Sequence, residues 1–440
     1  MSRFRDKNAG TNYIAYDHGE DDIDRRGFLR CMAWAGTATL WLLEGGVPRS
    51  YSLRQLGGGA GTDAAKQHVL FAQISDSHIG FNKEANKDVT ATLQEAVAKL
   101  NALPRHPALV LHTGDITQLS KADEFDTADQ VLKGLRTERV CYVPGEHDVL
   151  NDNGASYLAR YGKPLRVKGG GWYSFDHSGV HFIGLVNVLN LRAGGLGSLG
   201  NEQLDWLRRD VKGLASSTPI VLFAHIPLWT VYPEWGWGTE DSEQALALLK
   251  RFGSVTVLNG HIHQIMQKVE GNVAFHTAMS TAFPQPAPGT APSPGPMKVA
   301  PERLRDVLGV TNVTYLAGRH SLAVVDATLS GVSPAVAMAG HDMNARRTTS
   351  TPRSRALTPN QIGIDNFSFT PPTLTVKAGT DVTWINFDDV PHIIASTRPK
   401  LASSPVLDTN QRFTSRFDTA GTFDYFCSIH PTMTGRIVVQ

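Results

Sequence analysis

Apolar and polar positions along the chain follow two different patterns. From about residue 68 to residue 339, short apolar runs of strand length alternate with longer stretches of helical periodicity. After a polar gap, residues 362–440 contain only short alternating runs separated by turn residues. The pattern therefore predicts an α/β domain followed by a small all-β sandwich.

The first pattern predicts a regular alternation of strands and helices. We expect helices over residues 89–103 and 122–135. The predicted strands cover residues 69–74, 108–111, 140–143, 172–175, 181–186, 220–223, 255–258, 274–278 and 321–326. A stretch rich in proline and glycine, residues 284–301, is expected to be a long surface loop.

The beginning of the chain has the pattern of a targeting segment. Arg25 and Arg26 precede a moderately apolar run over residues 32–43, which is shorter than the ~20 residues of a membrane span. Paired arginines before such a run resemble a twin-arginine export signal, and a buried helix is the alternative interpretation. We expect a signal and low-complexity leader over residues 1–66, no stable membrane span, and a periplasmic or extracellular protein.

Polar residues separate the two predicted domains. Residues 341–361 contain several arginines, threonines and prolines and few apolar residues, which is typical of a flexible linker. A tether of this length has an r.m.s. reach of only ~25 Å, so the domains should stay close together. We therefore expect domains over residues 67–340 and 362–440, joined by this linker.

Composition excludes few classes of function. The chain has 440 residues, of which 41% are hydrophobic and 19% charged, as in an ordinary soluble protein. A net charge of +1 argues against dedicated nucleic-acid binding. Three cysteines cannot form a disulfide framework, and Cys141 lies in an apolar strand pattern typical of an inert buried thiol. Cys427 needs another explanation in an exported protein, and a metal is a common one.

Five polar motifs stand directly after predicted apolar strands. Ligands of α/β sheets converge at the carboxyl ends of their strands. Carboxylates and imidazoles gathered there can hold two divalent metal ions that share a bridging carboxylate. The motifs are Asp76-Ser77-His78, Gly114-Asp115, Gly145-Glu146-His147-Asp148, His225 and Gly260-His261-Ile262-His263.

This order of motifs resembles the calcineurin-like metallophosphoesterases. The resemblance implies a two-sheet α/β/β/α sandwich over residues 67–340. It further implies hydrolysis of a small-molecule phosphate mono- or diester through hydroxide held between two divalent metal ions (Mn, Fe, Zn or Mg). The implied metal ligands are Asp76, His78 and His263 for the first metal, Glu146, His225 and His261 for the second, and Asp115 as the bridge.

The third motif carries both the implied catalytic residues and a departure from the family. The resemblance implies that His147 stands near the leaving-group oxygen and is oriented by Asp148. The family usually has asparagine at the position of Glu146. A carboxylate there keeps a hard oxygen donor but adds a negative charge, so the site is either rebuilt or disabled. Because the other ligands are present, we expect Glu146 to remain a ligand of the second metal.

A second set of metal-binding residue types lies near the C-terminus. Cys427, His430 and Met433 follow one another at three-residue steps, and His392 lies upstream after an apolar strand pattern. A thiolate, two imidazoles and a thioether are the donors of a type 1 copper site. The segment resembles cupredoxins of the amicyanin and pseudoazurin group, which implies a Greek-key sandwich. The resemblance also implies a copper ion held by these four residues and a redox partner at the copper domain.

Two hypotheses of function follow. The first is an exported phosphoesterase fused to a copper electron-transfer domain. The second is a copper-binding electron carrier whose phosphoesterase-like domain is a non-catalytic scaffold. Retention of His147 and Asp148, which are not expected to bind metal, favours catalysis. A further hypothesis is that the copper oxidation state tunes a redox-active metal, such as iron, in the first site.

Overall fold

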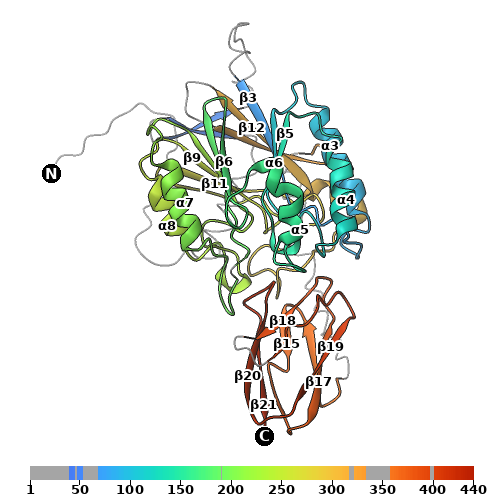
Figure 1. Ribbon diagram of the computed structural model, residues 1–440. Helices are drawn as coiled ribbons and strands as arrows, with labels where there is room; N and C mark the ends of the chain where they lie inside the picture. The colour runs from blue at the N-terminus through green and yellow to red at the C-terminus, as the bar shows by residue number, and fades with distance from the viewer. Residues whose placement is uncertain are drawn as a thin grey trace, which may run out of the picture.

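The computed structural model describes residues 39–44, 47–52, 68–189, 191–316, 322–332, 357–396 and 401–440. The paired arginines and most of the predicted linker lie outside these residues. Figure 1 shows a larger α/β domain and, at one end of it, a smaller β domain that includes the C-terminus.

Two sheets form the larger domain. The first has the strand order β10-β11-β9-β8-β7-β6, and the second has the order β13-β12-β3-β4-β5. The strands of the first are β6 (Tyr173–His177), β7 (Val180–Gly184), β8 (Ile220–Phe223), β9 (Val255–Asn259), β10 (Gln267–Glu270) and β11 (Val273–Thr277). The strands of the second are β3 (His68–Ile74), β4 (Leu109–His112), β5 (Arg139–Tyr142), β12 (Gly309–Leu316) and β13 (Leu322–Thr328).

Helices cover the outer faces of the two sheets. In Figure 1, α3 and α4 lie on one side of the domain, and α7 and α8 lie on the other. The α-helices are α3 (Val89–Asn101), α4 (Ala122–Leu132), α5 (Ala155–Tyr157), α6 (Lys163–Leu165), α7 (Asn201–Val211), α8 (Ser242–Leu249) and α9 (Leu304–Val307). Shorter 3-10 and π turns are η2 (Glu146–Asp148), η3 (Leu158–Gly162), η4 (Pro233–Trp235) and η5 (Pro301–Arg303).

The core between the sheets explains why they pack face to face. Phe71 of β3 and Phe182 of β7 meet edge to face, with ring centroids 5.2 Å apart. Val110 of β4 and Val221 of β8 belong to the same buried cluster. Burial of such apolar surface stabilises by about 25 cal/mol per Å². The predicted α/β/β/α architecture is therefore confirmed.

Strand β12 lies between β13 and β3 in its sheet but was not among the predicted strands. It pairs antiparallel with both β3 and β13. Polar residues interrupt its apolar pattern. Thr311 is fully buried, and its hydroxyl group is satisfied there because it donates to Asp326 over 2.6 Å. Because β12 carries polar residues such as Thr311 at buried positions, it lacks the continuous apolar run from which strands were predicted.

Two four-stranded sheets form the smaller domain, as predicted. Their orders are β15-β14-β17-β19 and β16-β21-β20-β18. Trp384 and Tyr425 are buried between them, with ring centroids 5.3 Å apart. The strands are β14 (Gln361–Asp365), β15 (Ser368–Thr370), β16 (Thr373–Val376), β17 (Thr380–Asn386), β18 (Ile394–Ser396), β19 (Arg412–Phe417), β20 (Gly421–Cys427) and β21 (Thr434–Val439).

Part of the predicted leader forms a hairpin. Strands β1 (Thr39–Glu44) and β2 (Val47–Ser52) pair antiparallel, and β1 lies beside β13. The described end of the apolar run is thus a strand rather than the helix of the alternative interpretation. Among the described residues, no helix combines the length and apolar character needed to cross a membrane.

A histidine between two carboxylates makes the stability of the larger domain dependent on pH. The imidazole of His181 contacts Asp176 at 2.7 Å and Asp210 of α7 at 2.9 Å. Burial favours its neutral form, but the hydrogen bonds and charges of Asp210 and Asp176 raise the pKa of His181 above its ordinary 6.5. The charged imidazole therefore adds stability below pH 6.5 that is lost as the pH rises through the elevated pKa.

We expect Asp210→Asn to lower the free energy of unfolding by about 1–2 kcal/mol at acidic pH, since it removes a hydrogen bond between charged groups. The difference from wild type should shrink as the pH rises through the pKa of His181. Urea unfolding at about pH 6 and about pH 9 measures it. Asp205→Asn, in an exposed pair with Arg208 on the same helix, is the matched control. A difference of equal size at both pH values would contradict this assignment.

Candidate metal centres

The predicted ligands of the larger domain meet at the carboxyl ends of β3, β4, β5, β8 and β9. The backbone is in the left-handed region at each of these positions: Asp76 (φ 53°), His78 (φ 42°), Asp115 (φ 50°), His261 (φ 71°) and His263 (φ 53°). Non-glycine residues rarely adopt this conformation, which concentrates at functional sites. The loops are therefore shaped to direct these side chains inward at some cost in backbone energy.

Glycines in the same motifs allow the loops to approach one another. A Cβ atom on Gly145 would lie 2.1 Å from the Asp115 carboxylate, and one on Gly260 would lie 2.1 Å from the Ser75 hydroxyl. Such distances are far inside van der Waals contact, so only glycine fits at either position. The glycines explain why motifs far apart in sequence can place their donors around one centre.

One cluster of donors contains the residues predicted for the first metal. The Nε2 atom of His263 lies 3.3 Å from a carboxylate oxygen of Asp76. The Nε2 atom of His78 lies 3.2 Å from that of His263 and 3.5 Å from Asp115. All four side chains are at most 3% exposed. The atoms are close enough to surround one ion.

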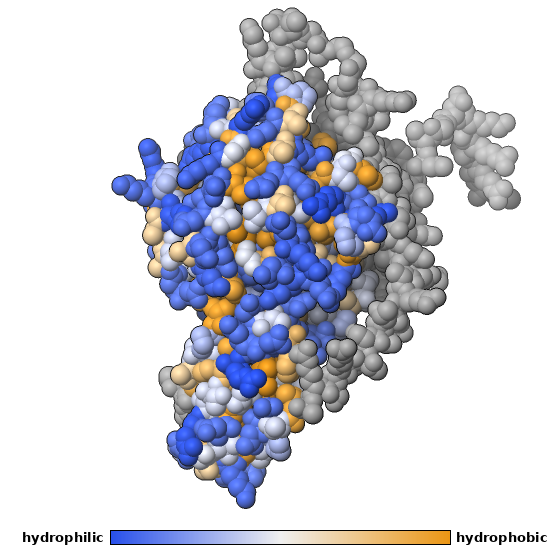
Figure 2. All heavy atoms as spheres, turned by 90° about the vertical axis from the view of Figure 1, so that its right-hand side faces the viewer, coloured by the Kyte–Doolittle hydropathy of each residue, from blue (hydrophilic) through white to orange (hydrophobic). Residues whose placement is uncertain are grey.

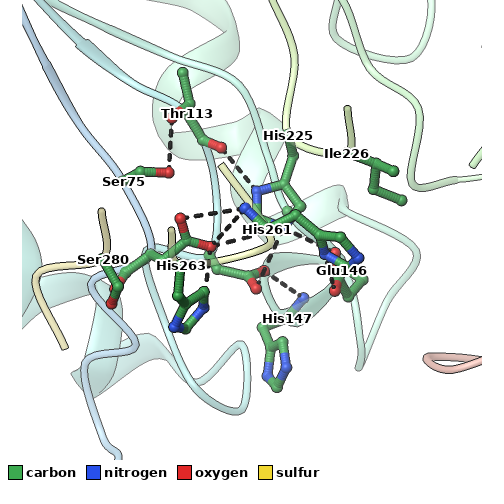
Figure 3. Close-up of polar contacts among 12 residues, drawn as sticks. Ser75, Thr113, Glu146, His147, His225, Ile226, His261, His263 and Ser280 are labelled. Atoms are coloured by element: carbon green, nitrogen blue, oxygen red, sulfur yellow. Dashed lines mark hydrogen bonds and ion pairs between the residues drawn. The ribbon is translucent and has the colours of Figure 1, made fainter. Parts of the chain in front are cut away.

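A neighbouring cluster contains the residues predicted for the second metal. The carboxylate of Glu146 lies 3.0 Å from Nε2 of His225 and 2.9 Å from Nδ1 of His261. Nε2 of His225 also lies 3.3 Å from Asp115, which therefore belongs to both clusters. Figure 3 shows His263 and Glu146 on opposite sides of the group. The structure thus brings all seven predicted ligands together.

Hydrogen bonds on the outer edges of the imidazoles fix which nitrogen faces the centre. Nδ1 of His225 donates to the carbonyl of Thr113 over 2.7 Å, and Nδ1 of His263 donates to the carbonyl of Phe283 over 2.6 Å. Nδ1 of His78 contacts the side-chain oxygen of Gln118 at 2.9 Å. In the neutral imidazoles, the Nε2 lone pairs then face inward, which is the arrangement of metal-binding histidines.

The charges of this group fit metal ions. Asp76, Asp115 and Glu146 are at most 4% exposed, and among the described residues none of them pairs with lysine or arginine. Nε2 of His225 and a Glu146 oxygen face each other without a hydrogen bond. Buried carboxylates are strongly unfavourable without a positive partner, and metal ions or charged imidazoles can supply that charge. Oxygen and imidazole donors suit hard or borderline divalent ions.

The same carboxylates also act on the neighbouring imidazole. Burial favours neutral His225, but Asp115 and Glu146 outweigh it and raise its pKa well above the ordinary value. This electrostatic field favours positive charge at the position of the second metal. Glu146 therefore adds negative charge where the second metal is predicted to bind.

The predicted relation between His147 and Asp148 is wrong. Nδ1 of His147 donates to the carbonyl of Gln118 over 2.8 Å, and its backbone N–H donates to Asp115. Asp148 instead accepts from the backbone N–H groups of Ile116, Thr117 and Gly145 and from the Thr117 hydroxyl. Because the two residues are adjacent on the short turn η2, their side chains point to different neighbours. Asp148 holds the loops together, and Gln118 orients His147.

Sequence reasoning missed Gln118 because one polar residue in a loop carries no spacing signal. Its side chain positions His78 and its carbonyl positions His147, so it supports both a predicted ligand and a predicted catalytic residue. His112, at the end of β4, contacts the hydroxyl of Ser77 at 2.9 Å. Burial lowers the pKa of His112 to about 4, so it is neutral at ordinary pH.

The predicted copper ligands meet at one end of the smaller domain. The Sγ atom of Cys427 lies 3.5 Å from Nδ1 of His392 and 3.7 Å from Nδ1 of His430. The two Nδ1 atoms are 3.3 Å apart, so the three donors form a triangle around one point. Met433 is buried in the same core, and its backbone bonds to Cys427 and His430 close the loop. A His₂Cys triangle with a nearby methionine fits a type 1 copper ion.

Asp388 completes this site and was not predicted. Its carboxylate contacts Nε2 of His392 at 2.9 Å, which leaves Nδ1 for the copper position. Burial favours neutral His392, but Asp388 and Cys427 raise its pKa to about 9. Burial likewise opposes a thiolate, and His392 overcomes it to lower the pKa of Cys427. The site is thus prepared for an anionic sulfur ligand.

Comparison with known proteins matches two families to two segments of the chain. The calcineurin-like phosphoesterase family matches residues 69–265, and the cupredoxin-like domain family matches residues 343–439. The chain joins a segment that matches the calcineurin-like phosphoesterases to a cupredoxin-like domain. The metals that these families imply are divalent ions for the first and copper for the second.

Individual relatives agree with this division. The cupredoxin segment is 36% identical over 84 residues to amicyanin-alpha of Methylorubrum extorquens, covering 18% of this chain and 71% of that protein. The phosphoesterase segment is 28% identical over 232 residues to the glycerophosphodiester phosphodiesterase GpdQ of Enterobacter lignolyticus, covering 50% and 79%. It is 26% identical over 241 residues to the 3',5'-cyclic adenosine monophosphate phosphodiesterase CpdA of Pseudomonas aeruginosa, covering 52% and 82%.

We expect Glu146→Ala to lose about one of the two equivalents of metal, because both carboxylate oxygens of Glu146 face imidazoles of the second cluster. Glu146→Asn should retain both equivalents and lower KM for an anionic ester, since it removes a negative charge but keeps an oxygen donor. Elemental analysis and steady-state kinetics measure the two effects. Glu202→Ala, exposed on α7, is the control. Unchanged metal content and activity in every variant would refute the role of Glu146.

Proposed function

We propose that this protein is an exported phosphoesterase that hydrolyses a small-molecule phosphate ester at a dinuclear metal site and carries a type 1 copper electron-transfer domain. The observation that carries the proposal is the pair of donor clusters sharing Asp115. Two metal ions held in this way supply a nucleophile at neutral pH and stabilise the charge of a phosphoryl displacement.

The chain's own residues supply position and proton transfer. Asp115 receives the His147 backbone N–H and thereby ties the loop of His147 to the shared carboxylate. Because Nδ1 of His147 donates to the Gln118 carbonyl, Nε2 remains as the atom that exchanges a proton with the substrate. Asp148 fixes the same loop through backbone N–H groups, so the imidazole keeps its place.

The relatives favour a diester as substrate. GpdQ and CpdA are both named as phosphodiesterases, and each matches about half of this chain. A diester has one negative charge fewer than a monoester, which suits a site with the extra carboxylate of Glu146. We therefore place a phosphodiester ahead of a monoester.

We expect His147→Ala to lower kcat for a chromogenic phosphodiester in Mn²⁺ by roughly 100-fold or more while leaving the metal content unchanged. Wild type should hydrolyse the diester faster than the matching monoester. His177→Ala, at the end of β6 away from the metal ligands, is the control. No turnover of either ester by wild-type protein, together with a strong copper–thiolate band, would favour the electron carrier with a non-catalytic scaffold.

Export by the twin-arginine route rests on Arg25, Arg26 and the apolar run that follows. Replacing both arginines with lysine should leave the protein inside the cell, while wild type reaches the periplasm. Cell fractionation with an antibody against the cupredoxin-like domain measures the distribution. Replacing Arg3 and Arg5 with lysine provides the control at arginines outside the motif. Equal distribution of all three proteins would refute the proposed route.

A further inference from the structure

The contacts between the two domains surround the copper-binding loop. The N–H of Gly194 donates to the carbonyl of Pro431, which lies between the copper-site residues His430 and Met433. Leu150, two residues after the Glu146–Asp148 turn, packs against the core of the cupredoxin-like domain. On the face shown in Figure 2, apolar residues lie at the narrow junction between the domains.

Other contacts fix the same orientation from different sides. Lys83 and Asp408 form an ion pair of 3.5 Å across the junction. Gly236 lies at the end of η4. A Cβ atom at this position would be in ordinary van der Waals contact with Thr432, at 3.9 Å. A Cβ atom on Gly295, in the proline-rich loop, would lie 3.3 Å from Phe367. The two domains therefore meet in one defined arrangement along several segments.

This arrangement directs the copper site toward the dinuclear site. The rings of His430 and His147 meet edge to face, with centroids 6.4 Å apart. On one side, Nδ1 of His430 belongs to the copper triangle. On the other side, the ring of His147 lies 4.8 Å from the ring of His78. The imidazoles of His430 and His147 thus lie between the copper site and the dinuclear site.

Phe367 encloses the connection. Its ring lies 4.7 Å from that of His430 and 5.6 Å from that of His392, and it also lies beside Gly295. The ring of His430 is half-buried and contacts the rings of Phe367 and His147.

We infer that His430 and His147 form a path for one electron between the copper site and the dinuclear site. The inference rests on the proposed function and assigns iron, a one-electron redox metal, to one position of the dinuclear site. Carboxylate and imidazole donors are suitable ligands for iron. The transfer oxidises Cu(I) to Cu(II) and reduces Fe(III) to Fe(II), and no bond is made or broken.

The consequence is that copper sets the charge of the dinuclear site. Reduction lowers the charge of the iron by one, which weakens its attraction for an anionic ester. The buried carboxylates act in the same direction, so the site is sensitive to each unit of positive charge. The cupredoxin-like domain would then regulate the phosphoesterase domain through this path.

The experiment uses the full chain loaded with copper and iron, in the absence of oxygen. A flash-generated reductant reduces the copper, and the copper–thiolate absorption band is followed in time. We expect the band to recover in a first-order phase whose rate does not depend on protein concentration. Freeze-quenched EPR should show Fe(III) disappearing as Cu(II) returns.

Two variants test whether the phase depends on the docked arrangement. Gly236→Trp places a bulky ring beyond a Cβ position that already contacts Thr432, and we expect it to push the copper loop away, lose the phase and keep the copper band. Gly179→Trp has nearly the same backbone conformation (φ 80° against 76°) but no neighbouring atom within 4 Å, and it should behave like wild type. Lys83→Glu should slow the phase, and adding Asp408→Lys should restore it.

The inference and the proposed function fail separately. Ester hydrolysis is measured on copper-free protein loaded with Mn²⁺, where no electron can be transferred from copper. If hydrolysis occurs but wild type shows no first-order phase, or binds no iron, the electron path is refuted. If the phase occurs without hydrolysis of any ester, the path stands and the phosphoesterase function is refuted. A phase that survives Gly236→Trp unchanged also overturns the path.

Discussion

The fold of the larger domain depends on burying three carboxylates around a common centre. Asp76, Asp115 and Glu146 come from three different strand ends and, among the described residues, find no lysine or arginine there. Positive charge among them, from imidazoles or bound metal ions, offsets their mutual repulsion in a medium of low dielectric. The left-handed backbone conformations and the glycines of these loops hold the carboxylates and imidazoles where they can reach a common ion.

Sequence reasoning recovered the parts of this arrangement that leave a local signal. Apolar runs ending in Asp, His or Gly-His motifs predicted both the strands and the residues that meet at their ends. The prediction for Asp148 was wrong because adjacency in sequence does not mean contact on a tight turn. Strand β12 was missed because polar residues interrupt its apolar run. The supporting residues Gln118 and Asp388 were missed because a single polar residue forms no pattern.

The relation between the domains was beyond the reach of the sequence. A polar linker predicts proximity only, since its length limits distance without setting orientation. The orientation depends on contacts such as Leu150 with the β-sandwich core and Gly194 with Pro431, which involve residues of no distinctive type. The spacing of copper ligands could predict a copper site, but not the residues that the half-buried His430 meets.

The hydrogen bond from Gly194 to Pro431 involves only main-chain atoms, so its strength is independent of the side chains at either position. Pro431 also lies within the short loop that carries His430 and Met433. A change in the length of this loop would therefore alter two things together: the geometry around the copper ion and the seating of one domain on the other. The length of this loop is therefore constrained by both domains. An insertion that a separate electron carrier could tolerate would here also displace the phosphoesterase-like domain from its contact with the loop.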